Sequence, residues 1–360
     1  MDDTAFNLTF LLGYNKKMQI SRRLNDHYTP EHYDLSLAID RQDRTFSGTV
    51  TIHGTAVTDG PIWLHSHDLT VDSCLVDGRE VPFELGENDE LELKSDVVAG
   101  GKHIVVVGFS GRVTDQMHGM YPCYFEHEGV KKELIATQFE SHHAREVFPC
   151  VDEPAAKATF DVTLTTETGV TVLGNMPISS QRTENDRLVT TFDRTPKMSS
   201  YLLAWVYGDL IKKTATTKSG VEVNIWATIA QPASSLDFAL DIATRTIDFF
   251  DDYFGTPYPL PKCDHVALPD FSSGAMENWG LITYREVALL AEPGKTSVSS
   301  KHRIAAVIAH ELSHQWFGNL VTMNWWNNLW LNESFANLME YIAIDALEPS
   351  WNVWFDFAAY

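Results

Sequence analysis

The sequence predicts a β + α/β protein, in which an N-terminal all-β domain, a saddle or a sandwich, is followed by a part that combines a sheet with helices. Three observations lead to this prediction. The chain has 360 residues, and at about 150 residues per domain this length suggests two domains. Apolar and polar residues alternate in short runs from about residue 28 to 207. Long helical patterns begin only after Gly208, so we expect domains at 19–208 and 209–360.

The first domain is predicted from short alternating runs that are separated by turns. Tyr33, Leu35, Leu37 and Ile39 alternate with polar or small residues, as on a half-buried strand. Further runs of this kind occur at 50–52, 104–109, 160–164 and 188–192. Turn signals between the strands are Asp59-Gly60-Pro61 and Asp77-Gly78. Many short strands without long helices between them indicate an all-β domain.

The second part begins with one more alternating strand at 221–225 and continues with helical patterns. A helix is predicted over 236–254, because apolar residues recur on one face of it, and Gly255 and Pro257 end it. A strand-like run follows at 266–268, and two further helices are predicted over 301–317 and 329–347. This order of elements predicts a sheet with helices packed on it.

Charge and cysteine content limit the classes of partner and compartment. The chain has 27 Lys and Arg against 49 Asp and Glu, a net charge of −22, which argues against nucleic acid and against an anionic membrane as partners. The four cysteines form no CxxC pair, and no apolar run is long enough for a membrane span. We therefore expect a cytoplasmic protein, whose residues 1–18 are a disordered tail or a misplaced start.

The strongest chemical signal is the motif His310-Glu311-Leu312-Ser313-His314, within the apolar helix predicted at 301–317. Residues four apart share a helix face, so the two imidazoles can hold one Zn²⁺. Glu311 is displaced round the helix from both histidines. It can take a proton from a water whose pKa zinc lowers to roughly 7. A chance HExxH match and a pair of core histidines remain open as alternatives at this point.

The next helix favours the zinc site over these alternatives. A catalytic zinc site needs a third protein ligand and an open position, and Glu333 lies eighteen residues beyond His314 on the helix predicted at 329–347. Gly318 and Asn319 supply the break between the helices, and Trp325, Trp326 and Trp330 are expected to supply packing bulk. We therefore predict one Zn²⁺ per chain, held by His310, His314 and Glu333.

With Gly274-Ala275-Met276-Glu277-Asn278 upstream, this pattern resembles the zinc aminopeptidases of the aminopeptidase N family. The resemblance extends from about Tyr28 to the end and is closest to the enzymes of lactic-acid bacteria. Other segments that resemble the family are Gln138-Phe139-Glu140, Val151-Asp152-Glu153-Pro154 and Lys197-Met198-Ser199-Ser200-Tyr201. The resemblance implies that the second part is an incomplete thermolysin-like zinc metallopeptidase domain, in which Glu311 is the general base.

The resemblance also implies a substrate site. Glu277 would bind the free α-ammonium group of a peptide, with Glu140 as its partner from the β domain. Gln138 and Met276 would line the first side-chain pocket. Gly274 and Ala275 would pair with the extended substrate through their backbone, and Asn278 completes the expected substrate-binding segment. The predicted function is hydrolysis of the N-terminal peptide bond of short peptides that have a free N-terminus, by a monomer.

One departure from the family leaves other functions open. A tyrosine about 60 residues beyond the glutamate ligand stabilises the oxyanion in that family, and the corresponding position lies past Tyr360. The chain therefore looks like an N-terminal fragment, and a zinc- and peptide-binding fragment without turnover is the main alternative. A zinc endopeptidase, an epoxide hydrolase and a structural β module with a vestigial helix pair also remain open.

Overall fold

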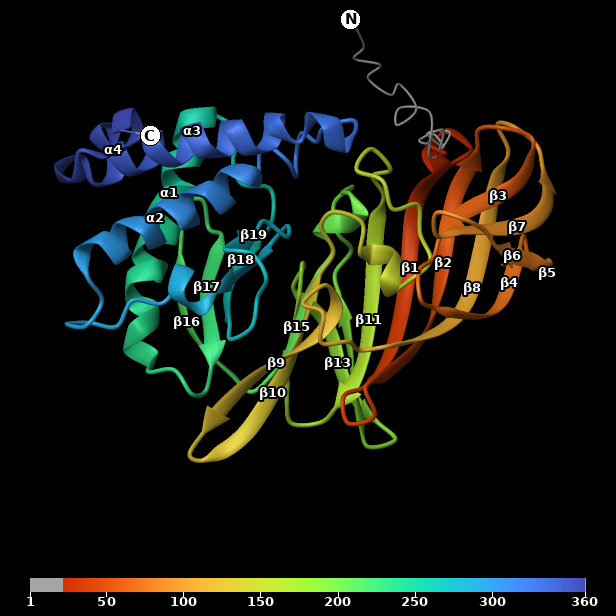
Figure 1. Ribbon diagram of the computed structural model, residues 1–360, viewed down its shortest axis with the longest axis horizontal. Coiled ribbons are helices and arrows are strands. Elements are labelled where there is room, and N and C mark those ends of the chain that lie inside the picture. The colour runs from red at the N-terminus through yellow and green to blue at the C-terminus, as the bar shows by residue number, and fades with distance from the viewer. Residues whose placement is uncertain (1–21, 360) are drawn as a thin grey trace, which may run out of the picture.

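The computed structural model describes residues 22–359, which form two parts that lie side by side (Figure 1). The first part is built almost wholly from strands, and the second combines a five-stranded sheet with helices. The predicted fold class is therefore confirmed. The predicted boundary falls between β15 (Trp205–Gly208) and β16 (Leu210–Thr216) and stays a prediction. The expectation for residues 1–18 concerns residues outside the described range.

The first part is organised around an eight-stranded sheet. In the order in which they lie side by side, its strands are β13 (Ile178–Glu184), β14 (Arg187–Phe192), β11 (Thr159–Glu167), β1 (Tyr28–Asp40), β2 (Thr45–Ala56), β8 (Lys102–Arg112), β4 (Thr70–Val76) and β5 (Arg79–Glu80). The pairing of β1 with β11 is parallel, whereas β2 and β14 pair with these strands in antiparallel fashion. Tyr33, Leu35, Leu37 and Ile39 all lie on the buried face of β1, as their alternation predicted.

Two smaller sheets complete the first part. One contains β12 (Thr171–Gly174), β15, β10 (Val130–Gln138) and β9 (Gly119–His127), and the other β3 (Gly60–His65), β7 (Glu90–Val97) and β6 (Phe83–Leu85). Short 3₁₀ turns are η2 (Leu24–Asp26), η3 (Ala144–Glu146) and η4 (Ser200–Leu202). Phe139, just after β10, packs edge-on against Phe148 and Trp205 in the core. This packing fixes the segment that carries Gln138 and Glu140.

The second part is built on a five-stranded sheet. Its order is β16, β17 (Glu222–Thr228), β18 (Lys262–Leu268), β20 (Leu281–Arg285) and β19 (Ala275–Met276), with parallel pairing of β17, β18 and β20. The alternating pattern at 221–225 correctly indicated a strand, but this strand is not half-exposed, because every residue of β17 after Glu222 is buried. Helices cover one face of this sheet, and the first part of the molecule approaches its other face.

The helices pack on the five-stranded sheet and on one another (Figure 1). Their bounds are η5 (Ala233–Leu236), α1 (Asp237–Phe254), η6 (Glu286–Ala288), α2 (Val298–His314), η7 (Trp326–Asn328), α3 (Trp330–Leu347), η8 (Pro349–Trp351) and α4 (Val353–Ala359). Gly255 ends α1 in the left-handed conformation, with φ 62°. No helix among the described residues is both long and apolar enough to span a membrane.

Three expectations from the sequence need correction. Helix α2 begins three residues before Lys301, because the Ser297 side chain accepts a hydrogen bond from the backbone N–H of Ser300, and it ends at His314 rather than at Phe317. Gly60 and Pro61 begin strand β3 rather than forming a turn. Trp330 does not supply packing bulk, since it is 59% exposed.

Candidate metal centre

Helices α2 and α3 pack side by side and bring the three predicted metal ligands together. His310 and His314 lie one turn apart on α2, and their Nε2 atoms are 3.1 Å from each other. The Oε2 atom of Glu333, in the first turn of α3, lies 3.4 Å from Nε2 of His310 and 3.6 Å from Nε2 of His314. We call this group the helix cluster.

The spacing of these donor atoms fits a zinc ion. Zinc bonds of ~2.0–2.1 Å to His and carboxylate ligands place tetrahedral donors about 3.3–3.4 Å apart, and the helix cluster has separations of 3.1, 3.4 and 3.6 Å. The two imidazole planes are nearly perpendicular, at 75°. Their nitrogens can therefore converge on one point between the rings.

Outer hydrogen bonds orient both imidazoles. The Nδ1 atom of His310 lies 2.8 Å from Oε2 of Glu340, and Nδ1 of His314 lies 3.0 Å from the backbone oxygen of Phe317. A proton on each Nδ1 satisfies these acceptors and leaves each Nε2 free to bind a metal. Glu340 was not among the predicted site residues, although its position seven residues after Glu333 places it on the same face of α3.

The charges of the cluster respond to one another. Burial opposes the positive form of His310, but hydrogen bonds with Glu333 and Glu340 raise its pKa to about 11. Burial likewise opposes protonation of His314, while the charge of Glu277 and the hydrogen bond to Glu333 raise its pKa to about 9. Burial raises the pKa of Glu311 to about 7, with the two histidines acting against this shift.

Three carboxylates converge beside the histidines. Glu140 follows β10 in the first part, Glu277 follows β19, and Glu333 belongs to α3. One oxygen from each lies within 4.8 Å of the others. Burial raises the pKa of Glu140 well above its usual range, and the charges of Glu277 and Glu333 raise it further. Such a group of carboxylates is stable as anions only when a cation accompanies it.

Several acceptor atoms of the predicted site residues are buried without a hydrogen-bond partner within residues 22–359. They are Oε1 of Gln138, Oε1 of Glu277, Oδ1 of Asn278 and Oε2 of Glu311. Buried polar atoms are rarely left unpaired. A cation or a hydrogen-bond donor bound near Glu277 and Glu311 would remove this cost.

The segment from Gly274 to Asn278 lies at a sheet edge. Ala275 and Met276 pair with Tyr284 and Thr283 of β20, and the backbone oxygen of Gly274 accepts from the N–H of Arg285 at 2.9 Å. Strand β19 is the last strand of its sheet among the described residues. Its outer edge can therefore receive a further extended chain.

Two side chains from the segment that directly follows α2 hold the backbone of Glu277. Its carbonyl oxygen accepts from Nε2 of Gln315 at 3.1 Å and from Nδ2 of Asn319 at 2.9 Å. Both donors are fully buried. Because Gln315 directly follows His314, the carboxylate of Glu277 and the helix cluster are fixed relative to each other.

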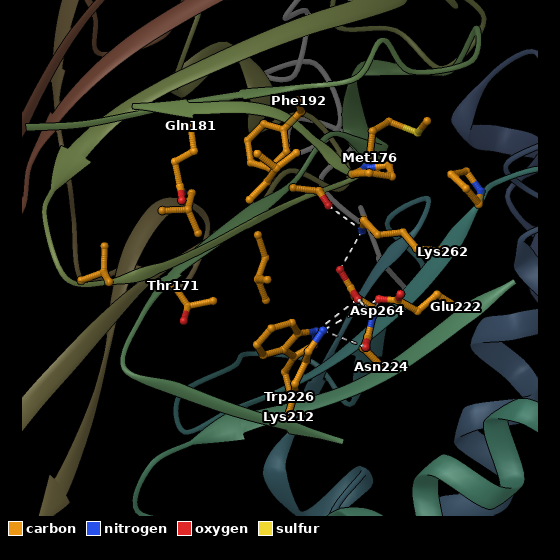
Figure 2. Close-up of a pocket in the computed structure, with 17 residues that line it drawn as sticks. Thr171, Met176, Gln181, Phe192, Lys212, Glu222, Asn224, Trp226, Lys262 and Asp264 are labelled. Atoms are coloured by element: carbon orange, nitrogen blue, oxygen red, sulfur yellow. Dashed lines mark hydrogen bonds and ion pairs between the residues drawn. The ribbon is translucent and has the colours of Figure 1, made fainter. Parts of the chain in front are cut away.

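Two side chains outside the helices hold the turn that follows. Nδ2 of Asn175 donates to the carbonyl of Trp279 at 2.9 Å, and Nζ of Lys262 donates to the carbonyl of Gly280 at 2.8 Å. Figure 2 shows Lys262 beside Asp264, to which it is joined by a 2.7 Å ion pair, at the wall of a cavity of about 560 Å³. Trp226 also donates to Asp264 at 3.1 Å. This network ties the turn to both parts of the molecule.

Tyr201 is another residue to which the sequence analysis gave no role. It is buried in η4, and burial together with the charges of Glu277, Glu140 and Glu333 raises its pKa far above the usual range. Its ring packs edge-on against Trp326 at 5.2 Å. The first part therefore contributes Tyr201 as well as Glu140 to the surroundings of the carboxylates.

Comparison with known proteins agrees with this arrangement. Residues 29–202 match the peptidase M1 N-terminal domain, and residues 238–360 match the peptidase family M1 domain. The chain is 53% identical over 334 residues to aminopeptidase N of Lactococcus lactis subsp. lactis, and 50% identical over 335 residues to aminopeptidase N of Lactobacillus delbrueckii subsp. lactis. It is 42% identical over 348 residues to aminopeptidase M1 of Arabidopsis thaliana.

These alignments cover 92%, 92% and 93% of the chain. The chain spans 39% of the length of each of these relatives. The resemblance inferred from the HExxH motif, Glu333 and the segment 274–278 is confirmed. The two domain matches and these identities show that the chain belongs to peptidase family M1.

Proposed function

We propose that this chain carries the active centre of a zinc aminopeptidase, which hydrolyses the N-terminal peptide bond of short peptides. The observation that carries the proposal is the convergence of Glu140, Glu277 and Glu333, with oxygens within 4.8 Å of one another, beside the imidazoles of His310 and His314. Two cations, a metal ion and the ammonium group of a substrate, would neutralise the negative charge of these carboxylates. The names of the relatives, aminopeptidase N and aminopeptidase M1, support it.

His310, His314 and Glu333 would hold the zinc ion, which when bound would supply a Lewis acid for the scissile carbonyl and acidify water. Glu311 would act as the general base. It is 6% exposed and its Oε2 has no hydrogen-bond partner among the described residues. With a pKa raised to about 7 by burial, its carboxyl can both accept and return a proton near neutral pH.

Glu277 and Glu140 would bind the free α-ammonium group of the substrate. Carboxylates in a secluded cleft form strong, charge-assisted hydrogen bonds with an ammonium group. Because Glu277 is fixed to Gln315 and Asn319, the bound amine would lie at a constant distance from the helix cluster. This distance would determine which peptide bond reaches the metal, and so make the enzyme an exopeptidase.

The remaining predicted residues would orient the substrate. The free edge of β19, at Gly274 and Ala275, would pair with its extended backbone, and Asn278 would complete this segment. Gln138 and Met276, both buried, would line the pocket for the first side chain.

We further propose that the chain acts as a monomer in the cytoplasm. The thiols of Cys74, Cys123, Cys150 and Cys263 are free, which fits a reducing compartment.

The test is hydrolysis of a panel of aminoacyl-p-nitroanilides by the zinc-loaded chain, with Glu311→Gln as the matched variant. We expect turnover to fall by about 10²–10⁴ in this variant while zinc stays bound, and N-acetylated substrates to be inert. Equal rates for free and acetylated substrates would contradict the proposed amine site and favour an endopeptidase.

Binding should be measured in parallel by calorimetry with an L-amino-acid hydroxamate. Amine-dependent binding without hydrolysis would support the alternative function, a zinc- and peptide-binding fragment. Absence of both zinc and hydroxamate binding would leave only the structural β module.

A further inference from the structure

A second group of two histidines and one glutamate lies in the first part of the molecule, outside the helix cluster. His118 immediately precedes β9, and His143 and Glu146 belong to the turn that contains η3. The backbone N–H of His143 donates to the carbonyl of Phe139 at 2.8 Å, and that of Glu146 to the carbonyl of His143 at 3.2 Å. We call these three residues the loop cluster.

The side chains of the loop cluster already face one another. Nδ1 of His118 lies 2.7 Å from Oε2 of Glu146, and Nδ1 of His143 lies 2.7 Å from Oε1 of the same carboxylate. The two imidazole rings are stacked, with centroids 4.1 Å apart. One donor atom from each residue lies within 4.8 Å of the others.

Gly119 makes room for this arrangement. It adopts φ 62°, and a Cβ at this position would lie 2.7 Å from Oε2 of Glu146. A side chain at residue 119 would therefore be strained and would displace the carboxylate from His118. Backbone conformation and side-chain position therefore agree in placing the carboxylate of Glu146 beside the Nδ1 atoms of both rings.

The loop cluster can be reached from solvent. The side chains of His118, His143 and Glu146 are 31%, 21% and 18% exposed. His118 and Glu146 line a cavity of about 290 Å³ together with His67 and Asp68. This cavity therefore opens onto two of the three residues of the loop cluster, His118 and Glu146.

We propose that His118, His143 and Glu146 form a second zinc site. Two imidazoles and one carboxylate are ligand types that zinc prefers, whereas magnesium and calcium prefer oxygen ligands alone. Each imidazole would bind zinc through an unprotonated Nδ1 and carry its proton on Nε2, the carboxylate of Glu146 would be the third ligand, and water would complete the coordination. Because tetrahedral zinc donors lie about 3.3–3.4 Å apart, the 2.7 Å contacts must lengthen and the stacked rings must turn.

The consequence of zinc binding here is structural. It would link the start of β9 to the turn that follows Glu140. An ion that binds to the folded chain but not to the unfolded chain shifts the unfolding equilibrium toward the folded state. This second site does not depend on the proposed peptidase activity, since it shares no residue with the helix cluster.

The test counts zinc equivalents by equilibrium dialysis of the 360-residue chain, prepared metal-free and without an affinity tag. We expect two equivalents for the unchanged chain and one for the double variant His118→Ala/His143→Ala. His142→Ala is the matched control, because its ring stacks on His143 at 4.7 Å yet lies outside the cluster. It should retain two equivalents.

Two further variants keep the proposal falsifiable. His310→Ala disables the helix cluster and should leave one zinc equivalent, which can then be assigned to the loop cluster. If the double variant does not fold, Glu146→Gln can be used instead, because it keeps the size of the side chain. It should weaken zinc binding at the loop cluster at least about tenfold, since loss of an outer partner alone costs 10–100-fold. One equivalent in the unchanged chain that His310→Ala removes, or two equivalents in the double variant, would overturn the proposal and leave a hydrogen-bonded His–Glu–His group.

Discussion

The helix cluster and the loop cluster contain the same residue types on different scaffolds. In the helix cluster, α2 sets the spacing of His310 and His314, and the imidazole planes are 75° apart. In the loop cluster, His118 and His143 come from separate segments, and their planes are 26° apart. The first arrangement directs both nitrogens to a common point, whereas the second directs each nitrogen to its own oxygen of Glu146.

The surroundings of the clusters differ as well. Glu340 and the carbonyl of Phe317 hold the outer nitrogens of the helix cluster, and its donor atoms are 3.1–3.6 Å apart. In the loop cluster the Nδ1 atoms themselves are hydrogen-bonded at 2.7 Å. The same residue types are therefore preorganised for a metal in one cluster and not in the other. Preorganisation by a rigid element and outer hydrogen bonds should make the helix cluster the tighter site.

The largest expected effect separates the two clusters. His314→Ala removes a proposed zinc ligand that is 1% exposed, so tight zinc binding at the helix cluster should be lost while the weaker equivalent stays. Dialysis against a zinc chelator of graded strength measures both. Ser313→Ala, the preceding residue on α2, is the control. Unchanged tight binding in His314→Ala would reverse the proposed order of the clusters.

The next effect tests the support behind the helix cluster. Lys262→Met removes three hydrogen bonds from Nζ and leaves Asp264, which is 2% exposed, without its cation. Breaking one partner of a buried pair costs about 3–5 kcal/mol, measured by urea unfolding. Lys212→Met is the control, because that side chain lines the same cavity but is 43% exposed. Equal losses in both variants would contradict the special role of Lys262.

A smaller effect concerns the outer partner alone. Glu340→Gln should weaken zinc binding at the helix cluster about 10–100-fold, because a carboxylate accepts the Nδ1 proton of His310 more strongly than an amide does. Competition with a fluorescent zinc chelator measures this change. Glu348→Gln, where the side chain pairs with Arg245, should have no effect on zinc. Zinc should bind to the loop cluster with the same affinity in both variants.

A further expected effect is a pH dependence of stability that arises near the loop cluster. His65 is buried, and burial with the nearby charge of Arg145 lowers its pKa to about 2, while its Nδ1 accepts from the N–H of Asp152 at 3.1 Å. The unfolded chain binds a proton at His65 below its ordinary pKa of about 6.5, whereas the folded chain does not. Stability should therefore fall as pH decreases from about 6.5 toward 2, by at most about 1.4 kcal/mol per pH unit from this group.

His65→Asn keeps an acceptor in place of Nδ1 and removes the titration. Its free energy of unfolding should depend less on pH between about 6.5 and 3 than that of the unchanged chain. The exposed His53, changed to Asn, is the control and should leave the slope unchanged. The same slope in all three chains would show that His65 does not contribute to acid unfolding.

Much of the fold could be predicted because its signals are local. The alternation in β1 and the one-sided pattern of α1 follow from burial of one face, which acts on neighbouring residues. Strands β19 and β20 were missed. Both are short, and burial of both faces leaves β20 with no alternation to detect.

The helix cluster could be predicted from local signals, since His310 and His314 are related by the pitch of one helix and Glu333 lies in the first turn of the next. The tertiary structure sets which groups from distant parts of the chain surround this cluster. Glu140 and Tyr201 approach from the first part, and Lys262 holds the turn from the neighbouring sheet. It also decided that His118 and His143 meet at Glu146. Helix periodicity is a local property of the backbone, whereas contacts between strands, turns and domains depend on how the whole core packs.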